Sequence, residues 1–306
     1  MCRKLPPFFE VKGRISWSKI ENVNTIEEIE NPVVRECLRS LDIEPDLDIH
    51  YHGDLPARSG LGSSSAFTVG LLHALHALRN EFVTKRVLAT EAIRVERELI
   101  GDTVGVQDQT AVAYGGLNYC LIDQQGNVVV RPVITAPSRI REFEQHLMLF
   151  FTGLSRNAGT VAATKVKSFA ERELQMTRIR QLTDRGLEAL QGAGDITELG
   201  RLLHETWQMK RQLSSVVSTD AIDEAYEAAR NAGAIGGKLM GAGGGGFLMI
   251  FAPPDRHPRI IEALGHLLYV PVEFETQGSQ VIFYDPDSYS RPARFGEMRL
   301  AANAGN

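Results

Sequence analysis

A run of glycines and serines at residues 56–66 has the composition of an anion-binding loop. It reads Pro-Ala-Arg-Ser-Gly-Leu-Gly-Ser-Ser-Ser-Ala and continues into an apolar stretch. Glycines allow a tight turn in which backbone N–H groups converge, and a following helix adds partial positive charge at its N-terminus. Three serines are more hydroxyls than a helix cap needs, so we interpret the run as a phosphate loop rather than as a serine-capped helix. The candidate residues are Gly60, Leu61, Gly62, Ser63, Ser64 and Ser65.

A second glycine-rich run lies at residues 236–246, directly before the apolar segment 247–251. Consecutive small residues cost backbone entropy unless another group must approach closely. Both flanks have the composition of buried segments, so the run predicts a loop that lies against another loop or against phosphate, and not a flexible linker. Neither run contains Gly-Lys-Ser or Gly-Lys-Thr, which excludes a Walker P-loop, and the spacing differs from a dinucleotide fingerprint.

Two acidic residues are candidates for work on a hydroxyl group and a metal ion. Asp108 stands between two glutamines after a glycine, in a stretch otherwise poor in charge, and Glu96 precedes it in a predicted helix. One carboxylate can orient a hydroxyl while the other holds Mg²⁺. A lone carboxylate is as often a solvated surface group, so this signal depends on its neighbours.

Composition excludes several classes of protein. The 306 residues are 43% hydrophobic and 23% charged, with 33 Lys and Arg against 38 Asp and Glu. No basic block is long enough to follow a phosphate backbone, so nucleic acid is not an expected partner. No apolar stretch reaches the ~18 residues of a membrane span. The three cysteines are widely spaced and form neither a disulfide framework nor a zinc site, so we expect a soluble, cytoplasmic protein.

Periodicity predicts an α+β chain with a change of character near residue 140. Alternating or continuously apolar segments predict strands, and apolar residues at helical spacing predict helices. The predicted strands are 14–19, 47–51, 116–122, 127–132, 146–151, 247–251 and 280–284. The predicted helices are 32–41, 64–78, 84–99, much of 157–232, and 259–268. Asn31 before Pro32 is a helix-start signal. We therefore predict two domains, 1–140 and 141–306.

The two glycine runs and Asp108 together resemble the GHMP kinases. Within that superfamily the chain is most similar to the D-glycero-D-manno-heptose 7-phosphate kinases. The similarity covers nearly all of residues 14–285. Besides the glycine runs, the segments that carry it are Arg14-Ile15-Ser16-Trp17-Ser18-Lys19, Gly105-Val106-Gln107-Asp108-Gln109, Phe151-Thr152-Gly153-Leu154-Ser155-Arg156, Trp207-Gln208-Met209-Lys210-Arg211 and Gly278-Ser279-Gln280-Val281-Ile282-Phe283-Tyr284.

The resemblance implies a fold and a reaction. The fold is a ribosomal-protein-like α/β domain, which binds ATP, followed by a ferredoxin-like domain. The reaction is ATP-dependent phosphorylation of a sugar phosphate at its anomeric hydroxyl. By position, Asp108 matches the catalytic aspartate, and Ser64 with Glu96 would hold Mg²⁺. The loop 60–65, with Gly241, Gly243 and Gly244, would surround the ATP phosphates.

Recognition of the acceptor is less determined by the sequence. Arg156, Lys210 and Arg211 are candidates for the phosphate of the substrate, because a guanidinium fork or an ammonium group suits that anion. Each is as readily a surface charge. Two histidine pairs, His50 with His52 and His73 with His76, have no evident third ligand, so we expect structural or exposed roles for them.

The chain departs from the family at its start. Members usually begin with a strand bearing an arginine and a Gly-Gly-Gly-Thr-Asp loop, upstream of the segment that matches at Arg14. Here we interpret residues 1–13 as a non-homologous lead-in. A start-site error, a truncation or a loss of activity would each account for this. The alternatives to a heptose 7-phosphate kinase are therefore a fucose- or galactose-type sugar kinase and a non-catalytic nucleotide-binding relative.

Overall fold

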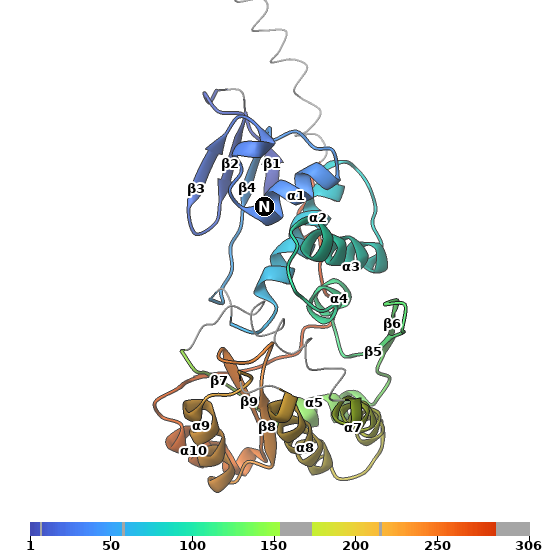
Figure 1. The fold of residues 1–306 in the computed structure, drawn as a ribbon, viewed down its shortest axis with the longest axis vertical. Helices are drawn as coiled ribbons and strands as arrows, with labels where there is room; N and C mark the ends of the chain where they lie inside the picture. The colour runs from blue at the N-terminus through green and yellow to red at the C-terminus, as the bar shows by residue number, and fades with distance from the viewer. Residues whose placement is uncertain (7, 57–58, 154–172, 214–215, 286–306) are drawn as a thin grey trace, which may run out of the picture.

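Two layered halves make up the protein (Figure 1). The computed structural model describes residues 1–6, 8–56, 59–153, 173–213 and 216–285. One half holds the elements β1–β4 and α1–α4, and the other holds β7–β10 with α5 and α7–α10. None of the described helices is long and apolar enough to cross a membrane.

The N-terminal half contains a sheet of order β1-β4-β2-β3. Its central pair, β4 and β2, is parallel, and both outer pairs are antiparallel. Ile15 of β2 lies beside Ile49 of β4, and both are buried in the core. The strands are β1 (Cys2–Lys4), β2 (Gly13–Ser16), β3 (Ile20–Val23) and β4 (Leu47–His50). The predicted strand at 47–51 is confirmed, whereas the one at 14–19 ends early and turns back into β3. β1 lies within the segment interpreted as a lead-in.

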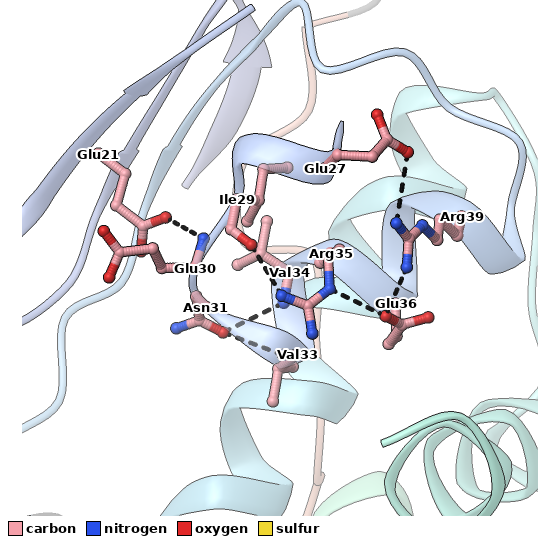
Figure 2. Close-up of polar contacts among 10 residues, drawn as sticks. All are labelled: Glu21, Glu27, Ile29, Glu30, Asn31, Val33, Val34, Arg35, Glu36 and Arg39. Atoms are coloured by element: carbon pink, nitrogen blue, oxygen red, sulfur yellow. Dashed lines mark hydrogen bonds and ion pairs between the residues drawn. The ribbon is translucent and has the colours of Figure 1, made fainter. Parts of the chain in front are cut away.

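Helix α1 (Pro32–Ser40) begins where the sequence predicted it (Figure 2). The Asn31 side chain accepts hydrogen bonds from the N–H groups of Val33 and Val34, at 3.0 and 3.2 Å. Those groups have no partner inside the helix, so the cap satisfies them. Just before the cap, the Glu30 N–H donates to Glu21 of β3 at 2.6 Å. The 3-10 turn η1 (Ile26–Glu28) precedes this cap, and the whole corner fixes α1 against the sheet.

Three further helices complete the core of this half. They are α2 (Ser63–Leu78), α3 (Lys85–Arg94) and α4 (Gln107–Tyr114). α2 contacts β1 of the sheet, and the other two pack on α2. α3 continues directly into a single π-helical segment, η2 (Val95–Leu99), which carries Glu96. The predictions of helices at 64–78 and 84–99 are confirmed. The π-helical end has no sequence signal, but such widened turns are frequent at functional sites.

The C-terminal half has a ferredoxin-like sheet of order β10-β7-β9-β8, in which every neighbouring pair is antiparallel. Its strands are β7 (Leu147–Phe151), β8 (Gly236–Leu239), β9 (Phe247–Phe251) and β10 (Leu268–Val270). Its helices are α5 (Pro137–Gln145), α7 (Glu173–Gln191), α8 (Thr197–Leu213), α9 (Asp220–Asn231) and α10 (His257–Ala263), with the 3-10 turn η4 (Pro254–Arg256). The hairpin of β5 (Asn118–Ile122) and β6 (Val128–Pro132) precedes them, as predicted.

The strand predicted at 280–284 is wrong. After β10 the chain returns to the N-terminal half, where Gly116 donates to Glu275 and Ser279 donates to Val112, each at 2.9 Å. No strand is assigned in the described residues 271–285. Ile282 and Phe283 are 94% and 81% exposed. Apolar composition suits a strand, yet a strand also needs a hydrogen-bonding neighbour, which composition does not reveal. The helix predicted at 259–268 similarly ends at Ala263, and β10 takes its last residue.

Candidate active site

The two glycine-rich runs meet between the two halves. An atom placed as Cβ on Gly60 would lie 3.1 Å from the Met240 carbonyl oxygen, and one on Gly241 would lie 2.7 Å from the Gly60 Cα. The approach is closest at Gly246, where the same atom would be 2.1 Å from the Ser59 carbonyl oxygen. The predicted contact between the second run and another loop is therefore confirmed, and it accounts for the lack of side chains there.

The first loop presents the N-terminus of α2. Gly60 and Gly62 adopt φ angles of 81° and 73°, which favour glycine. Gly62 is the N-cap residue, and among the described residues no side chain caps α2. The first N–H groups of a helix have no partner inside it, so they are available to an anion. Ser64 is exposed in this first turn. The loop therefore has the form of a phosphate cradle.

Asp108 lies against this cradle. It belongs to the first turn of α4, and a Cβ on Gly62 would be 3.2 Å from Asp108 Cβ and 3.4 Å from its Oδ2. The residue is exposed, yet the protein atoms around the carboxylate still raise its pKa by partial desolvation. A carboxylate beside bound phosphate is placed to accept a proton from a hydroxyl that attacks it.

Glu96 is 2% exposed and lies behind the loop. Its Oε2 accepts hydrogen bonds from Ser65 Oγ at 3.0 Å and from Gln109 Nε2 at 2.5 Å. Burial raises the pKa of Glu96, while the neighbouring side chains of Thr68, Gln109 and Ser65 lower it. The Thr68 hydroxyl itself donates to the Ser64 carbonyl oxygen at 3.2 Å. Its Oε1 is buried and has no hydrogen-bond partner among the described residues.

A magnesium ion fits this arrangement. A buried carboxylate oxygen without a partner requires a positive or hydrogen-bonding group. Mg²⁺ in phosphate-transfer sites is usually held by one or two protein oxygens together with substrate phosphates. Glu96 Oε1 and the exposed Ser64 hydroxyl, which is part of the cradle, are oxygen groups of this kind. Sequence reasoning selected Ser64 and Glu96 but missed Ser65 and Gln109 as partners of the carboxylate.

The cationic candidates lie on α8, apart from Arg156, which is outside the described residues. Lys210 Nζ donates to the Gly241 carbonyl oxygen at 2.7 Å, so it touches the second glycine loop. Arg211 donates to Asp223 at 2.5 Å, and Ser218 donates to the other oxygen of the same carboxylate at 2.6 Å. In this structure, then, Lys210 is next to the site and Arg211 is engaged in an ion pair with α9.

Three of the four paired histidines contact acidic or polar side chains, and His52 stacks on His50. His50 lies 2.9 Å from Asp48, and His73 lies 2.9 Å from Ser279. His76 is buried between Glu81 and Glu91, at 3.0 and 2.7 Å. Among the described residues no group of three or more His, Cys, Asp or Glu is arranged to hold a metal ion.

A pocket of about 240 Å³ lies beside α2, one turn after the phosphate cradle. Its walls are the ends of β1 and β4 and one face of α2. The lining residues are Met1, Cys2, Ile49, His50, Tyr51, His52, Ala66, Phe67, Gly70, Leu71 and Ala74. Sequence reasoning missed this pocket, because small residues on a helix face do not distinguish a pocket wall from a packing surface. The rings of His50, Tyr51, His52 and Phe67 are among its lining groups, and aromatic walls suit a flat, weakly polar ring.

Comparisons with known proteins find two family models that match this chain. The model of the GHMP kinases N terminal domain matches residues 24–116, and the model of the GHMP kinases C terminal matches residues 187–269. The first match contains the phosphate cradle, Glu96 and Asp108, and the second contains Lys210 and the second glycine loop.

The individual proteins to which this chain is similar are named as kinases. The chain is 34% identical over 218 residues to a D-glycero-alpha-D-manno-heptose 7-phosphate kinase of Campylobacter jejuni, covering 71% of this chain and 64% of that protein. It is 30% identical over 236 residues to a mevalonate kinase of Methanothermobacter thermautotrophicus, covering 72% and 69%. A crystal structure of a D-glycero-D-manno-heptose 1-phosphate kinase from Bacteroides thetaiotaomicron has the same fold, with a TM-score of 0.71, 24% identity, and 93% and 86% coverage. The chain thus spans just under two thirds of the length of the Campylobacter relative.

Proposed function

Because the chain belongs to the GHMP kinases, we propose that it transfers the γ-phosphoryl group of ATP to the anomeric hydroxyl of D-glycero-D-manno-heptose 7-phosphate. The product would be the 1,7-bisphosphate, a precursor of nucleotide-activated heptose. One observation carries the proposal: Asp108 lies against Gly62, where the open N-terminus of α2 is available to phosphate. The choice of heptose is supported by the Campylobacter relative.

Different groups of the chain would bind the phosphates, the adenine ring and the metal ion of Mg-ATP. The backbone from Gly60 to Ser65 would surround the phosphates, with Gly241, Gly243 and Gly244 closing the second side. The pocket beside α2 would receive the adenine ring. Ser64 and Glu96 would hold Mg²⁺, which supplies charge neutralisation for the phosphates.

Asp108 supplies the proton chemistry. The anomeric hydroxyl would give its proton to the Asp108 carboxylate while its oxygen bonds to the γ-phosphorus. The bond between that phosphorus and the β,γ-bridging oxygen breaks, and ADP leaves. Phosphoryl transfer needs mainly alignment and stabilisation of charge, so a base, a cradle and a metal ligand are sufficient.

The acceptor's own phosphate requires a cation. We retain Arg156, Lys210 and Arg211 as its candidates. Lys210 has the strongest support, because its amine already lies at the second glycine loop. Arg211 would have to leave Asp223 to serve this role.

The experiment that tests the function is an acceptor panel. ADP release is measured with Mg-ATP and heptose 7-phosphate, unphosphorylated heptose, fucose, galactose or mevalonate, alongside calorimetric binding of ADP. We expect release with heptose 7-phosphate above all others. Release with fucose or galactose alone identifies another sugar kinase. Binding of ADP without release on any acceptor identifies a non-catalytic nucleotide-binding protein and overturns the proposal.

A further inference from the structure

Two glutamines flank Asp108, and the structure treats them differently. Gln107 is exposed, whereas Gln109 is 1% exposed. Burying an amide is unfavourable unless its polar atoms find partners. A buried glutamine directly after the catalytic aspartate therefore needs a physical reason that its exposed neighbour does not.

The amide nitrogen of Gln109 is engaged with Glu96. Gln109 Nε2 donates to Glu96 Oε2 at 2.5 Å, and Ser65 Oγ donates to the same oxygen at 3.0 Å. The opposite amide orientation would place two acceptor oxygens against each other, so the carboxylate itself determines how the amide is turned.

Both donors use one oxygen of Glu96 and leave the other. Glu96 Oε1 is buried and has no hydrogen-bond partner among the described residues, and neither does Gln109 Oε1. If Gln109 served only to satisfy a buried acid, the natural arrangement would place one donor on each oxygen. Two donors from different helices on one oxygen instead fix the plane of the carboxylate and keep Oε1 available.

The position of Gln109 also links the metal ligand to the base. Asp108 and Gln109 are consecutive in the first turn of α4, and Glu96 lies in η2, the widened end of α3. A shift of α4 would move the base and the support of the carboxylate together.

We propose that Gln109 is a positioning residue, which holds Glu96 by Oε2 so that Oε1 faces the metal ion of the bound nucleotide. The inference rests on the proposed function, because it assumes that Glu96 holds Mg²⁺. Gln109 itself does not touch the reacting atoms. Hydrogen-bonding supports of this type typically change metal affinity by ~10–100-fold when they are removed.

The test measures how much Mg²⁺ tightens the binding of ADP. Isothermal titration gives the ADP dissociation constant with Mg²⁺ and with EDTA, for wild type, Gln109→Ala, Ser65→Ala and the matched control Gln107→Ala. We expect Gln109→Ala to lose about tenfold or more of the tightening by Mg²⁺. Its metal-free binding should change by no more than about twofold, as should every constant of Gln107→Ala. Ser65→Ala should show a smaller loss of the same kind, and it serves as the second variant if Gln109→Ala does not fold.

The outcomes separate the inference from the function it rests on. If wild type binds ADP no more tightly with Mg²⁺, the proposed role of Glu96 fails. If wild type responds to Mg²⁺ and both folded variants retain the full response, Gln109 is a structural residue and the inference is wrong. An equal loss of metal-free and Mg²⁺-supported binding also overturns it, because a distorted cradle, and not a misplaced metal ligand, would produce that result.

Discussion

In the loop before α2, two glycines with positive φ are followed by three serines, an uncapped helix and two carboxylates within reach. In the loop between β8 and β9, Gly241, Gly243, Gly244 and Gly246 also have positive φ, but their neighbours are backbone atoms of Gly60, Val217 and Ser59. In the first loop, Gly62 turns the chain into the uncapped N-terminus of α2. The second uses glycine so that two stretches of backbone can touch.

Because of this difference, we expect residues beside the first loop to control the reaction and residues of the second loop to control stability. Both carboxylates of the site, Asp108 and Glu96, lie beside the first loop. The second loop contributes shape, and the Gly244 N–H is held by the Val217 carbonyl oxygen at 2.9 Å. Changes beside the first loop should therefore affect turnover, whereas changes in the second should affect folding.

The largest expected effect is on turnover, from Asp108→Asn. Loss of a positioned general base costs ~10²–10⁴-fold in rate. The amide is nearly isosteric and remains in the first turn of α4, so ADP affinity should stay within about twofold. ADP release with heptose 7-phosphate and calorimetric ADP binding measure the two quantities.

Asp102→Asn is the matched control for loss of a nearby carboxylate, because Asp102 is exposed and precedes α4. It should retain most of the wild-type rate. Comparable rates for Asp108→Asn and wild type would show that the chemistry does not depend on this carboxylate. The assignment of turnover to the groups beside the first loop would then be wrong.

The second effect is on stability, from Gly246→Ala. The new methyl group would lie 2.1 Å from the Ser59 carbonyl oxygen, at a φ of 101°. We expect a loss of about 3 kcal/mol in the free energy of unfolding, measured by urea denaturation. The control is Gly186→Ala in α7, where nothing lies within 4 Å. That change should stabilise the protein by ~0.5–1 kcal/mol. Equal tolerance at both glycines would show that the loops do not depend on their close contact.

Sequence alone predicted much of this contrast, because the features involved are local. The start of α1 at Asn31 follows from a cap and a proline, and the site candidates Asp108 and Glu96 follow from residue type and neighbours. The glycine run at 241–246 predicted close approach, because the entropy cost of so many small residues is offset only where backbone must pack against backbone or a ligand.

The remaining features depend on partners far away in the chain. β1 forms because β4 offers an edge to Cys2–Lys4, and 280–284 is not a strand because no neighbour is described beside it. The role of Gln109 was hidden because nothing in Gln-Asp-Gln shows which amide faces inward. The pocket beside α2 was hidden for the same reason, since it arises where β1, β4 and α2 meet.

A smaller effect is expected from Lys210→Ala. The amine donates to the Gly241 carbonyl oxygen and so connects α8 to the second loop. If it also binds the acceptor's phosphate, the KM for heptose 7-phosphate should rise by about tenfold, with a loss of about 1 kcal/mol in stability from the missing hydrogen bond. Arg211→Ala, which removes the ion pair with Asp223, should leave that KM within about twofold. A loss of stability with no change in KM would restrict Lys210 to supporting the loop.

The smallest effect is a shift of the acid side of the pH profile of kcat/KM. Partial desolvation raises the pKa of Asp108, and a general base works only in its ionised form, so kcat/KM should fall on the acid side at a pH above the ordinary aspartate value of about 3.9. Burial also raises the pKa of Glu96, so protonation of either carboxylate can produce the acid limb. A second measurement is needed to tell the two apart. Protons and Mg²⁺ compete for Glu96, so a limb that moves to lower pH as Mg²⁺ is increased belongs to Glu96, and one that stays belongs to Asp108. Lys210→Ala should leave the limb in place, since Lys210 is not among the groups that shift the pKa of Asp108 or of Glu96. If the acid limb moves in this variant, the charge of Lys210 at the second loop affects the carboxylates beside the first loop.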